Sequence, residues 1–223
     1  MDPLRSCLAL GPVAIYLLLL GMINLSRRPV LVSTVRDTAT LALALSGMIV
    51  IGPMELFFPY SAAARFGDYV WLLLTLLYVM CVVLILLLLR PRLVIYNISV
   101  DKLRSSLAEA VERLDADAHW AGDSLVLPHL NVQLYVDNYP ALRNVSLVSA
   151  GGSQSQAGWR RLELVLLALL ARAEVPCGAG GLGLLAAGLL ILAGLVVIVA
   201  QNPQAASQSL LELVRALMKS VGL

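Results

Sequence analysis

Glu55 has the clearest chemical potential in this chain, because it is the one acid well inside an apolar run. A carboxylate at membrane depth is costly to keep and commonly serves ion or proton movement. Three aromatic residues, Phe57, Phe58 and Tyr60, follow it closely, and aromatic rings gather where a membrane meets water. Two interpretations therefore stand: an interfacial carboxylate, which the aromatic neighbours favour, and a proton or ion relay within the membrane.

The two histidines, His119 and His129, are the next candidates, because imidazole is a common metal ligand. A zinc site would require them to converge with acids such as Asp123 or Asp137, and no histidine spacing typical of a metal-binding helix supports this. The three cysteines are scattered and form no paired redox or metal motif. We therefore expect no metal site and no cofactor.

Catalytic sets are also missing from the sequence. It contains no HExxH motif, no recognisable serine–histidine–aspartate set and no pair of catalytic carboxylates in a polar context. The glycine-rich stretch at 177–183 is not followed by the lysine and hydroxyl residue of a phosphate-binding loop. We expect no catalytic residues. The net charge of +2 is too small to suggest nucleic-acid binding.

Small residues on one face of the last long apolar run form a candidate helix-packing seam. Ala179, Gly183 and Ala187 stand four residues apart, and Gly194 lies near the same face. In lipid there is no hydrophobic force between apolar helices, so close van der Waals contact holds them, and small residues permit it. The seam is predicted to meet another spanning helix, either in this chain or in a partner.

Four apolar runs, each long enough to cross a bilayer, set the framework for these residues. The clearest is residues 70–89, which carry no charge and would span about 30 Å as a helix. The others are about 8–25, 38–58 and 178–200, and a kink is expected near Gly52 and Pro53. Charged residues make up 13% of the chain, against about 25% in soluble domains. The sequence therefore predicts an α-helical polytopic membrane protein.

The positive residues predict which side of the membrane each segment occupies. Ten Lys and Arg residues lie in the loop between the first two runs or near the two ends of segment 91–176. These segments share a side, because two crossings separate them. Only four lie near the other side: Arg5, Arg65, Arg215 and Lys219. The positive-inside rule places residues 91–176 in the cytoplasm and both termini outside the plasma (inner) membrane.

Residues 91–176 are predicted to form a small inserted α+β domain. Residues 93–98 are rich in β-branched and aromatic types, which favours a strand, and residues 100–114 place Leu103, Leu107 and Val111 at helical spacing. Short strands are expected at 118–120, 124–127, 131–136 and 142–148, with a final helix at 159–175. We summarise the order as β-α-β-β-β-α, a two-layer domain with both helices on one face of a mostly antiparallel sheet.

The last helix of this domain is apolar on most of its circumference, so we expect burial on more than one side, against the sheet and against either the bilayer surface or a partner. The predicted organisation is three transmembrane helices in 1–90, the domain in 91–176 and a fourth transmembrane helix in 177–201. Residues 202–223 follow as a polar linker with an amphipathic interfacial helix at about 209–221.

These features favour a non-enzymatic integral membrane protein whose cytoplasmic domain mediates protein interaction, as an assembly or regulatory subunit of a membrane complex. The lipid bilayer is one partner, and a protein partner or a second copy would contact the fourth helix and the soluble domain. A transport component that uses Glu55 is the alternative. A membrane-bound enzyme is the third hypothesis, which the missing catalytic sets disfavour.

Overall fold

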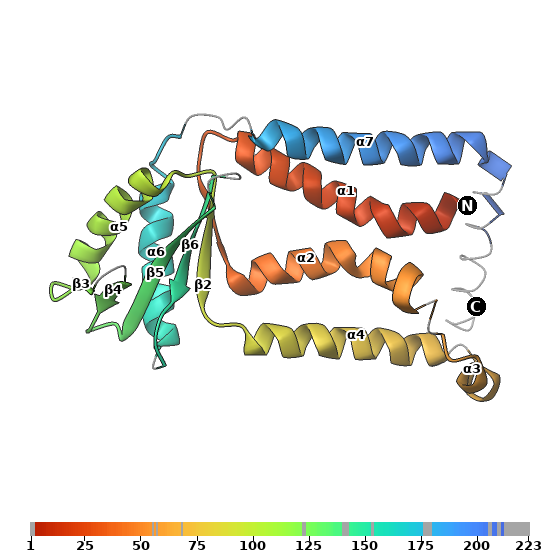
Figure 1. Cartoon of the computed structure of the whole chain (residues 1–223), viewed down its shortest axis with the longest axis horizontal. Helices are drawn as coiled ribbons and strands as arrows, with labels where there is room; N and C mark the ends of the chain where they lie inside the picture. The colour runs from red at the N-terminus through yellow and green to blue at the C-terminus, as the bar shows by residue number, and fades with distance from the viewer. Residues whose placement is uncertain are drawn as a thin grey trace. The chain divides into compact units, whose positions relative to one another are not determined.

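Figure 1 shows the computed structural model, which describes residues 3–54, 56, 58–67, 69–121, 124–139, 143–152, 154–175, 180–204, 207–208 and 211. Glu55 and Ala179 lie outside the described residues, as does the predicted helix at 209–221 apart from Leu211. In the part of the chain that the structure describes, four helices are long and apolar enough to span a membrane. They are α1 (Pro3–Leu25), α2 (Thr34–Ile49) with its continuation η1 (Val50–Met54), α4 (Tyr69–Leu88) and α7 (Gly180–Gln201). The prediction of four such helices together with a small antiparallel sheet is confirmed.

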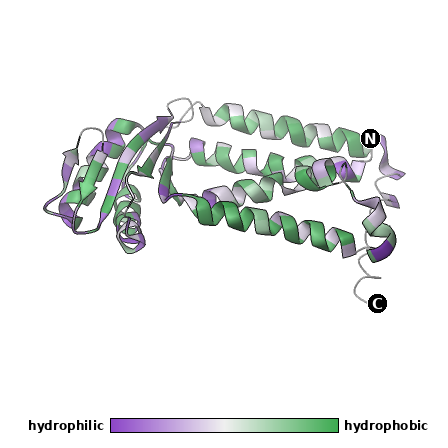
Figure 2. Ribbon diagram, turned by 60° about the horizontal axis from the view of Figure 1, so that its bottom comes forward, coloured by the Kyte–Doolittle hydropathy of each residue, from purple (hydrophilic) through white to green (hydrophobic). Residues whose placement is uncertain are grey.

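The apolar residues of α4 lie on all sides of the helix rather than on one face. Leu72, Leu73 and Ile85 are 62%, 54% and 51% exposed, although successive residues of a helix are turned by about 100°. Figure 2 shows hydrophobic residues along the length of the long helices. A helix that is apolar all round and is not covered by protein requires an apolar surrounding.

The predicted kink in the second spanning helix is realised as a change of helix type. Residues Val50–Met54 form a π-helix that contains Pro53. Proline has no backbone N–H and its ring clashes with the carbonyl four residues earlier, so a wider turn at this point accommodates it. A short helix that the sequence did not predict, α3 (Tyr60–Phe66), follows.

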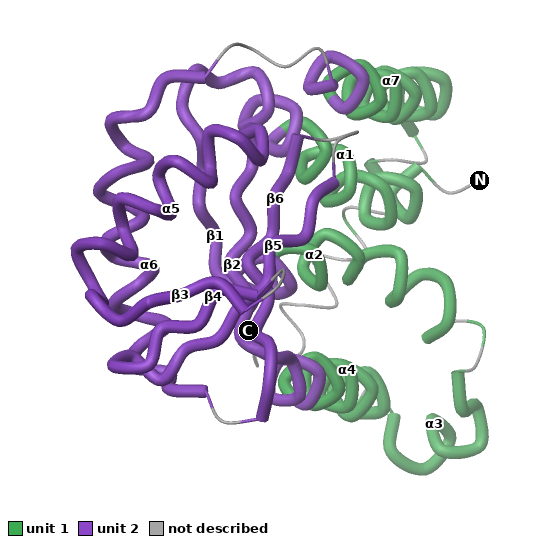
Figure 3. The backbone as a smooth tube through the Cα atoms, turned by 60° about the vertical axis from the view of Figure 1, so that its left-hand side comes forward, with its two compact units in different colours: residues 1–18, 40–83, 185–223 green, residues 19–39, 84–184 purple. Residues whose placement is uncertain are grey.

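The chain divides into two compact units, shown in Figure 3: unit 1 with residues 1–18, 40–83 and 185–223, and unit 2 with residues 19–39 and 84–184. Within unit 1, a Cβ atom added to Gly47 would lie 1.9 Å from the carbonyl oxygen of Leu8, so glycine allows α2 to approach α1. The hydroxyl of Tyr78 on α4 donates a 2.7 Å hydrogen bond to the carbonyl of Ala42 on α2.

Unit 2 contains a six-stranded antiparallel sheet with two helices. The strand order is β1-β2-β6-β5-β4-β3. The strands are β1 (Val30–Ser33), β2 (Arg92–Tyr96), β3 (His119–Ala121), β4 (Ser124–Leu127), β5 (Val132–Tyr139) and β6 (Asn144–Ser149), and the helices are α5 (Val100–Leu114) and α6 (Gln156–Leu170). Figure 1 shows both helices on the same side of the sheet, which agrees with the predicted two-layer arrangement.

One apolar core joins the sheet to its helices. Leu103 and Leu107 on α5 share this core with Val132 and Leu134 on β5, and all four are at most 2% exposed. The alternation along β5 places these residues on the helix-facing side, as the sequence predicted. Their burial explains why α5 forms: its apolar residues recur at helical spacing and meet a sheet face of the same character.

The strands predicted at 118–120 and 124–127 both form, as β3 and β4, so the summary order β-α-β-β-β-α counts one strand too few. That order also misses β1, which joins the sheet from the loop between α1 and α2. Leu31 on β1 is only 9% exposed and belongs to the core. Sequence reasoning missed β1 because it is four residues long and pairs with a strand about sixty positions later, which no local pattern reports.

Candidate functional site

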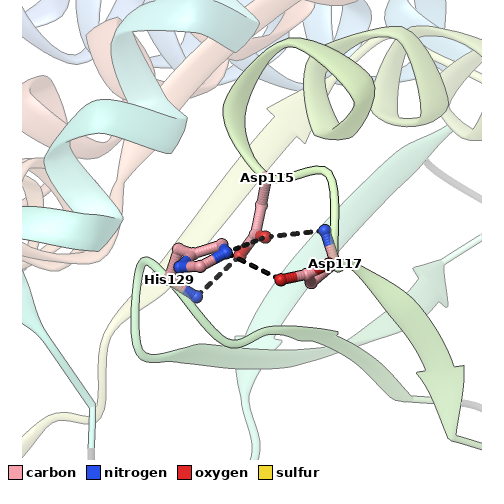
Figure 4. Close-up of side chains that lie close together, drawn as sticks. All are labelled: Asp115, Asp117 and His129. Carbon is pink, nitrogen blue, oxygen red and sulfur yellow. Dashed lines mark hydrogen bonds and ion pairs between the residues drawn. The ribbon is translucent and has the colours of Figure 1, made fainter.

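The structure brings Asp115, Asp117 and His129 together at one end of the sheet, as Figure 4 shows. Asp115 and Asp117 follow the last turn of α5, and His129 lies in the turn between β4 and β5. Their ligand atoms all lie within 4.8 Å of one another. The acids considered from the sequence were Asp123, which lies outside the described residues, and Asp137 on β5, so this grouping was not predicted.

The hydrogen bonds of Asp115 hold two segments of the fold together, and we call Asp115, Asp117 and His129 the structural bracket. One oxygen accepts the backbone N–H of Asp117 at 3.1 Å and the other accepts the backbone N–H of His129 at 2.8 Å. The side chain of Asp115 is fully buried, so these bonds satisfy a polar group that would otherwise be costly. Asp115 therefore ties the end of α5 to the β4–β5 turn.

The outer pair of this bracket is exposed. Nε2 of His129 lies 2.8 Å from Oδ2 of Asp117, and the side chains are 67% and 70% exposed. The distance is that of a direct hydrogen bond, and exposed pairs of this kind add little to stability. The two backbone N–H groups that Asp115 accepts account for the arrangement as part of the fold, and the same three side chains are of types that could hold a metal ion.

The structure alters the acidity of Tyr139, at the end of β5. Its pKa is raised above the usual value because its hydroxyl hydrogen-bonds to the side chain of Asp137, whose negative charge also disfavours the phenolate. The two residues stand two positions apart on β5 and so point to the same face of the sheet. Tyr139 stays protonated at neutral pH and can act there as a hydrogen-bond donor.

The glycines of α7 that approach α1 are different from those predicted. In unit 1, a Cβ atom on Gly188 would lie 2.9 Å from Leu18 and 3.1 Å from the carbonyl oxygen of Ala14. In unit 2, a Cβ atom on Gly181 would lie 2.9 Å from the carbonyl oxygen of Gly21. Gly181 and Gly188 are seven residues apart, which puts them on one face of a helix. Glycine at these positions permits close backbone approach.

The predicted seam occupies the other side of α7. Cβ atoms on Gly183 and Gly194 would meet no described atom within 4 Å, and Ala187 is partly exposed. At 100° per residue the seam is turned by roughly half a circle from Gly181 and Gly188. Within the described part of the chain these two glycines contact no other helix, so the packing role of Ala179, Gly183, Ala187 and Gly194 stays a prediction about a partner.

The last domain helix, α6, has one face in the core and one apolar face outside it. Leu162, Leu166 and Leu170 are at most 1% exposed, whereas Leu164 is 65% and Leu167 is 40% exposed. The expected burial on more than one side is not completed by the described residues of this chain. We call Leu164 and Leu167 the outer face of α6.

The start of α2 is anchored to the sheet by contacts that no sequence pattern suggested. The hydroxyl of Tyr96 on β2 donates to the carboxylate of Asp37, and Arg92 pairs with the same carboxylate at 3.6 Å. Thr34 donates through its hydroxyl to the carbonyl oxygen of Arg92. Asp37 and Tyr96 both lie in unit 2. These contacts join residues of the predicted loop between the first two spans to the predicted soluble domain.

No protein-family model matches this chain, and no curated protein and no solved structure matches it significantly.

Proposed function

We propose that this chain is a non-enzymatic integral membrane protein whose α+β domain binds a protein partner, as an assembly or regulatory subunit of a membrane complex. Insertion is supported by four long apolar helices, each of which exposes large apolar side chains, and by α4, where they are exposed on all sides. The ten-to-four distribution of positive residues supports a cytoplasmic domain, with both termini outside the plasma (inner) membrane.

The proposal of a protein partner depends on the exposed outer face of α6, Leu164 and Leu167. An isolated exposed leucine is ordinary, but Leu164 and Leu167 are neighbours at helical spacing on a helix already held in the core by its opposite side. Arg161 and Arg172 are exposed on the same helix and just after its end. Two exposed leucines with two arginines on the same helix or just after it favour a partner that presents apolar and acidic side chains.

Photo-crosslinking in native membranes tests this surface. A photoreactive residue at Leu164 should form an adduct of defined mass, while the same residue at Arg104, an exposed position on α5, should not. The substitution Leu167→Glu should abolish the adduct, because it places a charge in the apolar contact. Equal adducts at positions 164 and 104, or an adduct that survives Leu167→Glu, would argue against an interface on α6.

Cysteine labelling tests the proposed orientation separately. Gly152 is exposed and lies in the segment before α6. A Gly152→Cys variant, with the three natural cysteines replaced, should react with a membrane-impermeant reagent only after the cells are broken. Labelling in intact cells would reverse the orientation without bearing on the α6 surface.

A further inference from the structure

Unit 2 contains a cavity of about 680 Å³ at the point where α4 ends and β2 begins. Its wall is formed by the last turn of α4 with the residues that follow, by the start of α2, and by the first turns of α6. Cavities of this size are typical of small-molecule binding sites. The lining residues all belong to unit 2.

The charged side chains of this cavity are mainly positive. Arg90, Arg92 and Arg160 line it, and among the described lining residues Glu163 is the acidic one. Arg92 pairs with Asp37, but its Nε atom is buried without a hydrogen-bond partner. Within the described part of the chain, the guanidinium groups of Arg90 and Arg160 form no hydrogen bond or ion pair. Among the described residues, therefore, nothing competes with an anion for these two guanidinium groups.

The start of α6 adds further donors to the same wall. Gln156 and Ala157, in its first turn, line the cavity. Ser155 caps the helix by accepting the N–H of Gly158 at 3.2 Å, and the first N–H groups of any helix have no partner inside it. A helix N-terminus also carries a partial positive charge. Both features favour an anion with several acceptor oxygens.

Apart from Ser33 and Thr34, most of the remaining wall is apolar. Leu86 and Leu87 come from the last turn of α4, Leu89 follows that helix, and Trp159 comes from α6. Apolar side chains beside arginines at the end of a spanning helix are arranged like the boundary between acyl chains and lipid phosphates. A ligand with both an anionic group and a hydrocarbon part fits this wall better than a free anion does.

We propose that this cavity binds the phosphate group of an anionic phospholipid. Arg90 and Arg160 bind the phosphate oxygens, because guanidinium groups match phosphate geometry with paired N–H donors. The first turn of α6 contributes its N–H groups, and the apolar wall contacts the acyl chains. The proposal that the phosphate belongs to a lipid rests on the proposed membrane insertion. The proposal that the cavity binds a phosphate group does not.

Native mass spectrometry of the full-length protein in detergent tests the proposal. Phosphatidylglycerol should be retained in preference to phosphatidylcholine with the same acyl chains. The double variant Arg90→Gln/Arg160→Gln should bind phosphatidylglycerol about tenfold or more weakly, since it removes two charge-assisted contacts. The control Arg161→Gln removes an exposed arginine one residue along the same helix, which does not line the cavity, and should keep the preference.

Glu163→Gln gives a readout in the opposite direction. It removes the acid of the cavity wall, so phosphatidylglycerol should bind more tightly, by roughly the few-fold that one nearby like charge costs. This gain of binding remains informative even if the double variant fails to fold, which its melting curve would show. Unchanged binding in Glu163→Gln would count against a phosphate in this cavity.

Inorganic phosphate separates the two sources of the anion. It should raise the melting temperature of the wild type only weakly relative to chloride at equal ionic strength. A strong effect of phosphate that the double variant abolishes, without any lipid preference, would overturn the lipid as source. Equal retention of both lipids and no effect of phosphate would overturn the site itself. Extraction of the protein by carbonate washing would contradict the proposed membrane insertion and leave the phosphate measurement readable.

Discussion

The hydroxyl of Tyr96 donates a 2.5 Å hydrogen bond to Oδ1 of Asp37, across 59 positions of sequence. Tyr96 is 7% exposed, so the bond lies in a largely protected place. Arg92 shares the carboxylate at 3.6 Å. Through the carboxylate of Asp37, the first turns of α2 are held against β2.

Tyr96→Phe removes only the hydroxyl from this contact. The free energy of unfolding should fall by about 1.5 to 3 kcal/mol, the range for hydrogen bonds to charged groups. Asp37→Ala should cost more, because it leaves both the tyrosine hydroxyl and Arg92 without this acceptor. Thermal melting of the purified protein measures both, and equal stability of all three proteins would show that the contact does not hold the sheet to α2.

Asp115→Ala should destabilise the protein more than Asp117→Ala does. The first change leaves two backbone N–H groups without their acceptor, at about 1 to 3 kcal/mol each. The second removes an exposed pair with His129, for which the loss should be about 0 to 1 kcal/mol. Similar losses in denaturant unfolding of the two variants would contradict the bracket.

Adding EDTA tests the same three residues in another way. A structural bracket needs no metal, so the melting temperature of the wild type should be unchanged by the chelator. A decrease that added zinc restores, and that His129→Ala abolishes, would turn the bracket into a metal site.

Leu107→Ala should cost about 2 to 5 kcal/mol of unfolding free energy, because Leu107 is 1% exposed in the core. Leu164→Ala is the matched control on α6: its side chain is 65% exposed, so the change should stay within about 0.5 kcal/mol. Hydrogen exchange of the domain amides would locate the loss. Wild-type melting of Leu107→Ala would remove α5 from the core.

Gly188→Leu should separate α7 from α1, because even a Cβ atom there would lie within 3.1 Å of Ala14 and Leu18. Gly183→Leu should leave this contact intact, since no described atom lies within 4 Å of its Cβ position. A maleimide cross-link between Cys7 and a Val199→Cys substitution reports the contact, because both residues line one cavity. Cys81 and Cys177 would be replaced in all variants.

The same pair of variants also tests the predicted seam. If Gly183 packs against a partner, Gly183→Leu should insert normally and keep the intrachain cross-link, yet weaken cross-links between copies or to another protein. Unchanged intermolecular cross-links would show that the seam is not an interface.

Tyr139 should ionise at a higher pH than free tyrosine, because Asp137 raises its pKa. Since the raised pKa lies above the usual value of about 10, any stabilising effect of the protonated form is present at neutral pH and is lost only at strongly alkaline pH. Asp137→Asn should shift the titration of Tyr139 back toward the ordinary value, as followed by NMR with labelled tyrosine. A titration that Asp137→Asn leaves unchanged would contradict the contact.

The sequence by itself determined the elements that depend on local composition and period. A run of 20 uncharged residues at 70–89 predicts a spanning helix from length alone. The helical spacing of Leu103 and Leu107 and the alternation of Val132 and Leu134 predict how each element turns its apolar side toward a core. These patterns are complete within a few turns or strand positions.

Only the tertiary structure decided which distant segments meet. Three contacts join residues far apart in the chain. Leu31 pairs with Ile95 in the sheet, and Asp115 accepts the backbone N–H of His129. On α7, Gly188 rather than Gly183 lies against α1. Closing such long loops is a property of the whole fold, because its entropic cost is balanced by the sum of many contacts. The sequence does not distinguish the glycines on the two faces of α7. Only the position of α1 decides which of them permits close approach of the two helices.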